Sequence, residues 1–456
     1  MEANLFFQTS QGNSLPLIFI RQTQWEEGLE QFNEREQKAF ALQQFKAKLG
    51  DVCIVTEADG SASKAYVGTG KQNAEQAIAY AATRLIPGSY IAQEHLTPTA
   101  LTNWALAQYR FGKYKKQDIN PRRLVVREEQ LADVSIDIEA VFLVRNLINL
   151  PTNDLGPEEL ALVLEDLAEQ HNGQFQQWVG KELLQHNFPA IYAVGCASAK
   201  SPRLLSLTWG NENNPKVSII GKGVCFDSGG LDIKPAQGMR LMKKDMGGAA
   251  HAIALAKWIM KKNLNLRLQV LIPAVENAIG PEAFRPGDIL TMRNGLTVEV
   301  DNTDAEGRLI LADAIVKACE EKPDLLIDFA TLTGSARAAV GTEIAALFCN
   351  DDALAQAIMD SAKYCDDPIW RLPLFSGYES MLESSVADLV NCSASPYAGA
   401  ITAALFLQRF LNAPLGWLHF DIMAWNLSSK PGKPEGGEAM GLRAVAHYLA
   451  GKYGSQ

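Results

Sequence analysis

The sequence predicts an α/β fold: a smaller N-terminal α/β domain and a C-terminal domain built on a mostly parallel central sheet flanked by helices. Two observations predict it. Short apolar runs typical of strands alternate with helical patterns along the chain. The later strands are nearly continuous apolar runs, as in sheets that are buried on both faces. We expect an N-terminal domain at residues 1–130, a connecting helix at 131–155 and a larger C-terminal domain at 156–456.

Five apolar runs predict the strands of the N-terminal domain: Leu15–Ile20, Cys53–Glu57, Ala65–Val67, Tyr90–Gln93 and Leu124–Val126. Helical patterns predict helices at Gln24–Lys46, Ala74–Leu85 and Ala100–Phe111. The stretch Gly68–Lys71 lacks the third glycine and the Ser/Thr of a phosphate loop, and it indicates an ordinary strand-to-helix turn. The basic run Lys113–Arg123 indicates a solvated connector rather than a nucleic-acid site.

A long helical pattern at Glu129–Leu150 predicts the connecting helix, which ends before Pro151 because proline disfavours helix in the preceding residue. Further strands are expected at Val217–Gly221, Leu268–Pro273, Thr297–Val300, Leu325–Phe329 and Leu418–Ile422. Further helices are expected at Gly247–Lys262, Leu309–Glu321 and Ala400–Leu411. Sites in such sheets form where loops leave the carboxyl ends of strands, so we expect the functional residues in those loops.

The composition excludes several classes of protein. Of 456 residues, 47% are hydrophobic and 21% charged, which excludes a disordered chain and a small disulfide scaffold. A net charge of −10 gives no overall positive field for nucleic acid or an anionic membrane. No apolar run approaches the roughly 20 residues of a membrane span. Seven scattered cysteines without a CxxC pair favour reduced thiols, and the first residues lack signal-peptide features. We therefore expect a cytoplasmic protein.

The sequence disfavours a zinc site built from histidine or cysteine. It holds only six histidines, with no HExxH or HxH pattern and no nearby cysteine pair. Any metal would be held by oxygen ligands and by an amine at most.

The first chemically informative segment runs from Gly221 to Lys234. Its glycines let the backbone bend and approach a ligand closely. Lys222, Asp227 and Lys234 are polar residues among apolar ones, which is unfavourable unless they are paired or bind something. Asp245 follows eleven residues later at the start of an apolar helix, where it alone would indicate a helix N-cap.

The second segment runs from Asp301 to Leu309. Asp304, Glu306 and Arg308 are spaced i, i+2, i+4, so an extended backbone would project all three to one side. Two carboxylates that converge at a dry strand end repel each other and raise a pKa unless a cation is present. Taken alone, this segment fits a solvated loop equally well.

The two segments together predict a pair of divalent metal ions. Asp227, Asp245, Asp304 and Glu306 supply four negative charges, which two divalent cations would neutralise. Such a pair clamps a bridging water, lowers its pKa and polarises a carbonyl or phosphoryl oxygen. Lys222 could ligate only as the neutral amine, whereas Lys234 would remain a protonated electrophilic helper. Oxygen-rich ligation suits zinc, manganese or magnesium.

Asn302–Leu309 reads NTDAEGRL, which resembles the signature of the leucine aminopeptidase (cytosol aminopeptidase) family of two-metal exopeptidases. GKGVCFDSGGLDIKP, which starts at Gly221, and MKKDMGGAA at Met242–Ala250 resemble the other metal segment of that family. VENAIG, RPGD and ATLTG, which start at Val275, Arg285 and Ala330, also match. The resemblance covers roughly residues 150–456.

The resemblance implies a set of roles. One metal would be held by Lys222, Asp227, Asp245 and Glu306, and the other by Asp227, Asp304 and Glu306. Lys234 and Arg308 would be the catalytic basic residues, with a bicarbonate ion at Arg308 as the general base. The substrate would contact Met242, Thr331, Leu332, Thr333 and Gly334. The resemblance also implies peptide substrates with a free N-terminus and a leucine-like first residue, and a homo-hexamer.

Two other functions remain open. The same carboxylates would serve a two-metal phosphoesterase, which would ignore a free substrate amine. A non-catalytic scaffold or DNA-binding member of the family is disfavoured by the net charge and by the complete ligand set. Two positions depart from the family pattern. Cys225 stands where threonine is usual and indicates packing. Asp232 stands where serine is frequent, and it is either a partner of a lysine or exposed. Trp417, His419, Asp421 and Trp425 alternate along a late strand, which favours packing over a border of the substrate pocket.

Overall fold

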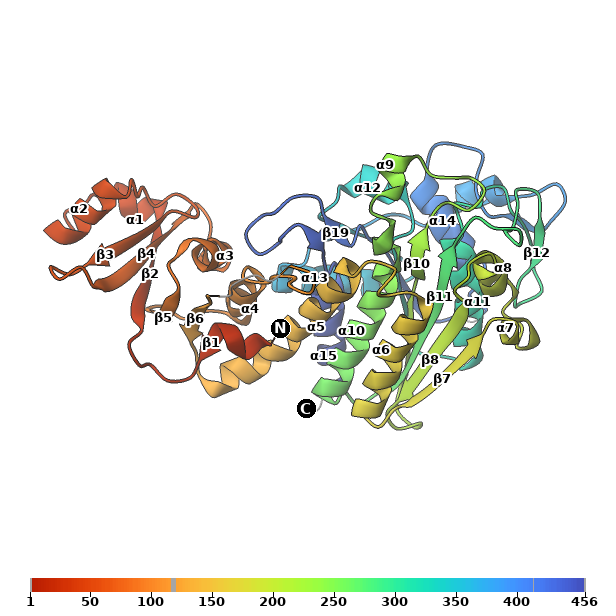
Figure 1. Cartoon of the computed structure of the whole chain (residues 1–456), viewed down its shortest axis with the longest axis horizontal. Helices are drawn as coiled ribbons and strands as arrows, with labels where there is room; N and C mark the ends of the chain where they lie inside the picture. Colours follow the sequence, from red (N-terminus) through yellow and green to blue (C-terminus); the bar gives the residue numbers. More distant parts are fainter. Residues whose placement is uncertain (1, 116–119, 413, 455–456) are drawn as a thin grey trace. The chain divides into compact units, whose positions relative to one another are not determined.

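The computed structural model describes residues 2–115, 120–412 and 414–454 (Figure 1). The chain divides into two compact units: Met1–Phe142 with Ser428–Glu435, and Leu143–Leu427 with Gly436–Gln456. The basic run Lys113–Arg123 lies partly outside the described residues, at positions 116–119. Among the described helices, none has the length and apolar character needed to cross a membrane.

The N-terminal unit contains a six-stranded sheet in the order β1-β6-β5-β2-β4-β3, in which only β3 and β4 pair antiparallel. Its strands are β1 (Phe7–Gln8), β2 (Leu15–Arg21), β3 (Val52–Thr56), β4 (Ala62–Gly70), β5 (Gly88–Ala92) and β6 (Arg122–Val125). Its helical elements are η1 (Ala3–Phe6), α1 (Gln22–Glu26), α2 (Glu34–Leu42), α3 (Ala74–Arg84) and α4 (Pro98–Leu106). All five predicted strands are present, which confirms the predicted α/β character of this part.

The prediction of one helix at Gln24–Lys46 is wrong, because the segment folds back on itself. Gly28, at φ +114°, lies between α1 and α2, and the Asn33 side chain caps α2 by accepting from the Glu36 N–H at 3.0 Å. The reversal brings the Trp25 ring to 5.3 Å from the Phe40 ring, in an aromatic cluster. These aromatic residues therefore pack across a turn rather than along one helix.

The C-terminal unit is organised by a nine-stranded sheet in the order β16-β15-β18-β14-β9-β11-β8-β7, with β10 also paired to β11. The central strands β18, β14, β9 and β11 run parallel, as does β10, whereas β7, β8 and the pair β15/β18 add antiparallel neighbours. The mostly parallel sheet is thus confirmed. The strands are β7 (Gln174–Val179), β8 (Arg203–Trp209), β9 (Lys216–Gly221), β10 (Gly223–Asp227), β11 (Arg267–Asn277), β14 (Leu325–Ala330), β15 (Ala345–Cys349), β16 (Ile369–Arg371) and β18 (Gly416–Asp421).

Helices cover both faces of this sheet. Figure 1 shows α6 and α10 along one side and α8 and α11 along the other, and all four contact β11. The helical elements are α6 (Pro157–Gln170), α7 (Glu182–Gln185), α8 (Pro189–Gly195), α9 (Ala236–Met239), η2 (Met242–Met246), α10 (Gly247–Lys262), α11 (Gly307–Glu320), α12 (Gly334–Val340), α13 (Asp352–Cys365), η3 (Ser376–Leu382), α14 (Gly399–Gln408) and α15 (Leu442–Tyr453). Helix α5 (Glu128–Asn149) crosses the boundary between the two units. The two-sided cover explains why the central strands are apolar throughout.

The predicted strand Thr297–Val300 does not join the central sheet. Its residues form β13 (Thr297–Glu299), which pairs with β12 (Ile289–Thr291) and β17 (Leu389–Val390) in a separate three-stranded sheet. A further two-stranded ladder pairs β19 (Trp425–Asn426) with β20 (Gly436–Gly437). The short strand β13 buries only Val298 completely, so its sequence could not show which sheet it joins.

His251 in α10 is a neutral histidine that links two parts of the C-terminal unit. Its Nδ1 lies 2.6 Å from the Gly247 carbonyl, and its Nε2 accepts from the Met440 N–H at 2.9 Å. One donor and one acceptor fit the neutral imidazole. Burial lowers the pKa of His251 to about 4.

We predict that His251 contributes to acid unfolding. Since its folded-state pKa lies below the unfolded value of about 6.5, its contribution is complete above pH 6.5 and is lost as the pH falls toward 4, by up to about 3 kcal/mol. Thermal unfolding between pH 7 and pH 4.5 should show a smaller acid decline in His251→Gln than in the wild type. His95→Gln, at an exposed position, should keep the wild-type slope. An unchanged slope in His251→Gln would contradict the assignment.

Candidate metal centre and active site

The first predicted segment leaves the sheet at the carboxyl end of β9. Lys222 follows β9 directly, and Asp227 is the last residue of β10. The Lys222 side chain passes close to the start of α11, where a Cβ on Gly307 would lie 2.5 Å from the lysine Cε. Glycine at position 307 is therefore required for Lys222 to reach its buried position.

Asp227 is buried and is held on both oxygens. Its Oδ1 accepts from the Gly229 N–H and from Asn277 Nδ2, each at 2.9 Å. Its Oδ2 lies 2.8 Å from the Lys234 ammonium. The carboxylate is thus oriented by groups from three places in the chain.

Asp245 does not cap helix α10, contrary to the simplest interpretation of its position. It lies in the 3₁₀-helix η2, and α10 begins after it at Gly247 with no side-chain cap. Its Oδ1 accepts from Thr331 Oγ1 at 2.7 Å, and its Oδ2 lies 2.6 Å from Lys222 Nζ. The Asp245 side chain therefore points away from α10 and toward the Lys222 ammonium.

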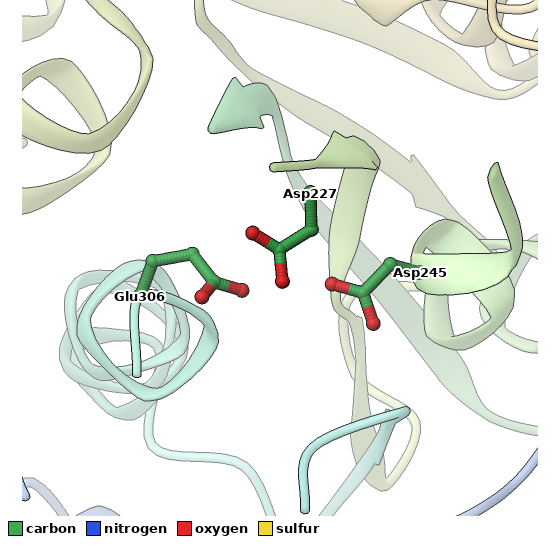
Figure 2. Close-up of side chains that lie close together, drawn as sticks. All are labelled: Asp227, Asp245 and Glu306. Atoms are coloured by element: carbon green, nitrogen blue, oxygen red, sulfur yellow. The ribbon is translucent and has the colours of Figure 1, made fainter. Parts of the chain in front are cut away.

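Glu306 completes a cluster of buried carboxylates. It occupies the N-cap position of α11 and is 1% exposed. Lys222 Nζ lies 3.0 Å from its Oε1, but neither carboxylate oxygen accepts a hydrogen bond from a described residue. Asp227, Asp245 and Glu306 each offer an oxygen within 4.8 Å of the others, and Figure 2 shows the three carboxylates turned toward one another.

The second predicted segment is not an extended strand. Asp304 lies in a turn, Glu306 directly precedes α11 without capping it, and Arg308 lies in the first turn of that helix. Asp304 reaches the cluster through Lys234, whose ammonium contacts both Asp304 and Asp227. Arg308 is 7% exposed and donates through Nη1 to the Asn391 carbonyl at 2.7 Å. The turn, rather than a strand period of two, brings these residues together.

The pKa values reflect a crowded negative site. Burial, followed by the charge of Asp227, raises the pKa of Glu306 to about 8 and that of Asp304 to about 6. Burial opposes the charge on Lys222, but Asp245, Glu306 and Asp227 outweigh it and raise the lysine pKa. Burial likewise opposes ionisation of Asp245, yet Lys222 and Lys244 keep its pKa below the usual value.

The residues present fit a divalent cation. Glu306 has two buried oxygens without a hydrogen-bond donor among the described residues, and Asp245 Oδ2 meets only the Lys222 ammonium. Four carboxylates lie close to two lysines, Lys222 and Lys234, so the carboxylates outnumber the ammonium groups that contact them. Hard or borderline cations with oxygen ligands match this donor set, and buried unpaired carboxylates are otherwise unfavourable.

A cavity of about 430 Å³ opens onto the cluster. All five residues that the sequence predicts to contact the substrate line it: Met242, Thr331, Leu332, Thr333 and Gly334. The cavity also borders the predicted catalytic residues Lys234 and Arg308. The loop that supplies four of the five leaves the carboxyl end of β14, between the loops of β9 and β18.

Asp421 is a residue whose contact with this loop the sequence did not indicate. It ends β18, the parallel neighbour of β14, and is 2% exposed. Its Oδ1 accepts from the N–H groups of Leu332 and Thr333 at 3.0 and 3.1 Å, and its Oδ2 accepts from Thr333 Oγ1 at 2.6 Å. The sequence held one signal for this contact: the predicted strands Leu325–Phe329 and Leu418–Ile422 both end beside the residues concerned. Parallel strands end at the same edge of a sheet, so residues at their ends can meet.

We predict that Asp421 positions the substrate loop. Asp421→Ala leaves the N–H groups of Leu332 and Thr333 without their acceptor and should lower kcat/KM by about 10- to 100-fold, mainly through KM. Asp421→Asn retains a carbonyl oxygen for the same N–H groups and should recover most of the activity. Steady-state kinetics on one unblocked substrate measures both. Equal activities in the two variants would contradict the positioning role.

The two positions that depart from the family pattern have ordinary roles. Asp232 joins the two segments: its Oδ2 accepts from the Thr303 N–H at 2.7 Å, while Thr303 Oγ1 accepts from the Asp232 N–H at 2.8 Å. Its partner is thus a threonine, and no ion pair joins it to a lysine among the described residues. Cys225 is buried in β10. His419 and Trp417 both contact Asp328, so the late strand contributes packing as well as the Asp421 contact.

Buried carboxylates and lysines that gather at the strand ends of an α/β domain, beside one cavity, are typical of an enzyme active site able to hold divalent cations. Comparison with known families specifies it further. The model of the cytosol aminopeptidase family catalytic domain matches residues 142–446, and that of the M17 aminopeptidase N-terminal domain matches residues 15–127. The chain belongs to the cytosol aminopeptidase family, and it is a hydrolase of the aminopeptidase type.

Individual relatives agree with this assignment. Peptidase B of Pectobacterium atrosepticum is 38% identical over 403 residues, which cover 84% of this chain and 91% of that protein. The crystal structure of the cytosol aminopeptidase from Coxiella burnetii is 44% identical in sequence, with a TM-score of 0.95. The match covers 99% of this chain and 100% of that one. The structure of the bottromycin maturation enzyme BotP in complex with Mn is 31% identical in sequence, with a TM-score of 0.86. The match covers 96% of this chain and 99% of that one.

Proposed function

We propose that this protein is a metal-dependent aminopeptidase that releases the first residue of peptides with a free N-terminus. The observation that carries the proposal is the buried set of Asp227, Asp245 and Glu306, with unpaired carboxylate oxygens beside a cavity. The metal dependence of the family supports the same conclusion.

The metal ligands are assigned as the family resemblance implies. Two divalent ions would be held, one by Lys222, Asp227, Asp245 and Glu306 and the other by Asp227, Asp304 and Glu306. Lys222 would have to lose its proton in order to ligate. Zinc and manganese are the first candidates and magnesium is the third, and the Mn complex of BotP supports manganese.

Bound metals would supply Lewis acidity, which polarises the peptide carbonyl and lowers the pKa of a water placed between them. The chain's own residues would do the rest. Lys234, held by two carboxylates at the cavity, would stabilise negative charge on the carbonyl oxygen. Arg308 has a buried Nε without an acceptor among the described residues, which supports an anion there, such as the bicarbonate of the family mechanism. That anion would serve as general base.

The family also suggests properties that lie beyond the site. We propose a leucine-like first residue as an accepted substrate, a homo-hexameric assembly and a cytoplasmic location. We retain residues 1–130, 131–155 and 156–456 as the proposed N-terminal domain, connecting helix and catalytic domain.

The test is a panel of aminoacyl amides and peptides assayed with Zn²⁺, Mn²⁺ and Mg²⁺, together with matched N-acetylated substrates. We expect the leucine amide to be cleaved and N-acetylation to abolish turnover, because the acetyl group removes the free amine that would bind a metal. Equal cleavage of blocked and free substrates would overturn the exopeptidase assignment. Hydrolysis of a phosphate ester in place of the amides would instead support a two-metal phosphoesterase.

A further inference from the structure

The loop that carries Asp304 and Glu306 has no regular secondary structure of its own. It runs from Asp301 to Glu306, between β13 and α11, and Asp301 at its start is exposed. Loops of this kind open easily, because water competes for their backbone hydrogen bonds. Contacts from outside the loop are therefore needed to keep the two carboxylates in place.

Asn391 holds this loop with the whole hydrogen-bonding capacity of its side-chain amide. Its Oδ1 accepts from the N–H groups of Asp301 and Asn302 at 2.8 and 3.2 Å. Its Nδ2 donates to the carbonyls of Asn302 and Ala305 at 2.8 and 3.3 Å. The residue is completely buried. If the amide were turned over, its NH₂ group would face two N–H donors, so the four hydrogen bonds fix a single orientation.

The backbone of Asn391 contacts the elements on both sides of the loop. Asn391 directly follows β17, and its N–H donates at 3.0 Å to the carbonyl of Glu299, the last residue of β13. Its carbonyl accepts at 2.7 Å from Nη1 of Arg308, in the first turn of α11. One residue thus contacts the strand before the loop, four backbone groups within the loop and the helix after it.

Thr303, in the middle of the loop, is held separately by the first metal segment and by Asn277. Its Oγ1 donates to the Gly229 carbonyl at 2.6 Å, and its carbonyl accepts from Asn277 Nδ2 at 3.0 Å. The same Nδ2 donates to Asp227 Oδ1 at 2.9 Å. Asn391 holds the residues on either side of Thr303, so its contacts add to these rather than repeat them.

We propose that Asn391 is a positioning residue for the metal centre: its side-chain amide holds the loop so that Asp304 and Glu306 stand in ligating positions before an ion binds. The inference rests on the metal assignment of the proposed function and deepens it. All the contacts are made by groups of the chain itself, so they form without an ion. A loop fixed in this way loses little conformational freedom when ions bind, and metal binding is stronger for that reason.

Metal binding tests this inference without turnover. Metal-free wild type and Asn391→Ala are titrated with Mn²⁺ in a calorimeter, and we expect the variant to raise the Kd by at least about tenfold. Urea unfolding establishes that each protein is folded under the conditions of the titration.

Asn350→Ala is the matched control. The Asn350 amide also bonds two backbone groups, the Leu415 carbonyl and the Trp417 N–H, each at 2.9 Å. These contacts lie at the start of β18, whereas the proposed metal ligands lie elsewhere, so the control should leave the Kd for Mn²⁺ within about twofold of the wild-type value.

Hydrogen exchange in the wild type covers the case in which Asn391→Ala does not fold. In the metal-free protein the amides of Asp301 and Asn302 should exchange at least about 100-fold more slowly than in an unfolded chain, because Asn391 accepts a hydrogen bond from each. Unprotected amides, or an Asn391→Ala protein that binds Mn²⁺ as tightly as the wild type, would overturn this inference alone. A wild-type protein that binds no divalent ion would overturn the proposed function and this inference with it.

Discussion

Replacing Glu306 with alanine is expected to lower kcat/KM by at least about 10³-fold, because the proposed role of Glu306 is to bridge both metal ions. Its two buried oxygens have no hydrogen-bond donor among the described residues, so the fold does not depend on them for internal hydrogen bonds. Steady-state kinetics on an unblocked peptide, together with the metal content after dialysis against Mn²⁺, measures the effect. We expect the variant to retain less metal than the wild type.

Glu306→Gln separates catalysis from folding. Since burial raises the pKa of Glu306 to about 8, the metal-free protein holds this side chain largely protonated at pH 7, and a neutral amide is a close substitute. Urea unfolding of the metal-free variant should therefore match that of the wild type, whereas activity should fall as in Glu306→Ala. Glu321→Ala, on the exposed end of the same helix, is the matched control and should keep full activity. Near-normal activity in both Glu306 variants would contradict the bridging role.

The fold was predictable because its central strands and long helices carry strong patterns. The predicted helix Gly247–Lys262 coincides with α10, and the predicted strands Val217–Gly221 and Leu325–Phe329 coincide with β9 and β14 within one residue. The distant parts of the chain against which short segments pack or pair could not be predicted. Gly28 reverses the chain between α1 and α2, and Val298 alone does not reveal that β13 pairs with β17.

The residues of the candidate site likewise fall into those that the sequence could identify and those that it could not. Lys222, Asp227 and Lys234 could be identified because charged residues among apolar ones are informative in a single segment. The partners that orient them could not, since they come from distant strands and have ordinary sequence surroundings. Asn277 reaches Asp227 from the end of β11, and Asp421 reaches the substrate loop from the end of β18. Their roles depend on the order of strands in the sheet, which no local pattern encodes.

Replacing Lys222 with methionine is expected to destabilise the metal-free protein by about 3 kcal/mol. Its ammonium lies 2.6 Å from Asp245 and 3.0 Å from Glu306, and all three side chains are at most 3% exposed. Removing the cation leaves the buried Asp245 carboxylate without its ion-pair partner, which costs far more than the loss of a surface ion pair. Because the pKa of Lys222 is raised, its contribution is complete throughout the neutral range, so the loss should be measurable by urea unfolding at pH 7.

The same variant tests the proposed ligand role of Lys222. The amine is the one nitrogen donor in the proposed ligand set, so activity at saturating Mn²⁺ should fall at least about 100-fold. Lys216→Met removes a lysine from the start of β9, the strand that Lys222 follows. Its ammonium lies 4.0 Å from Glu321 in a partly exposed pair, and the change should alter stability by less than about 0.5 kcal/mol. If Lys222→Met were as stable as Lys216→Met in metal-free buffer, the buried ammonium would not be what holds the carboxylates together. Full activity with Mn²⁺ would show separately that the metals bind without the amine.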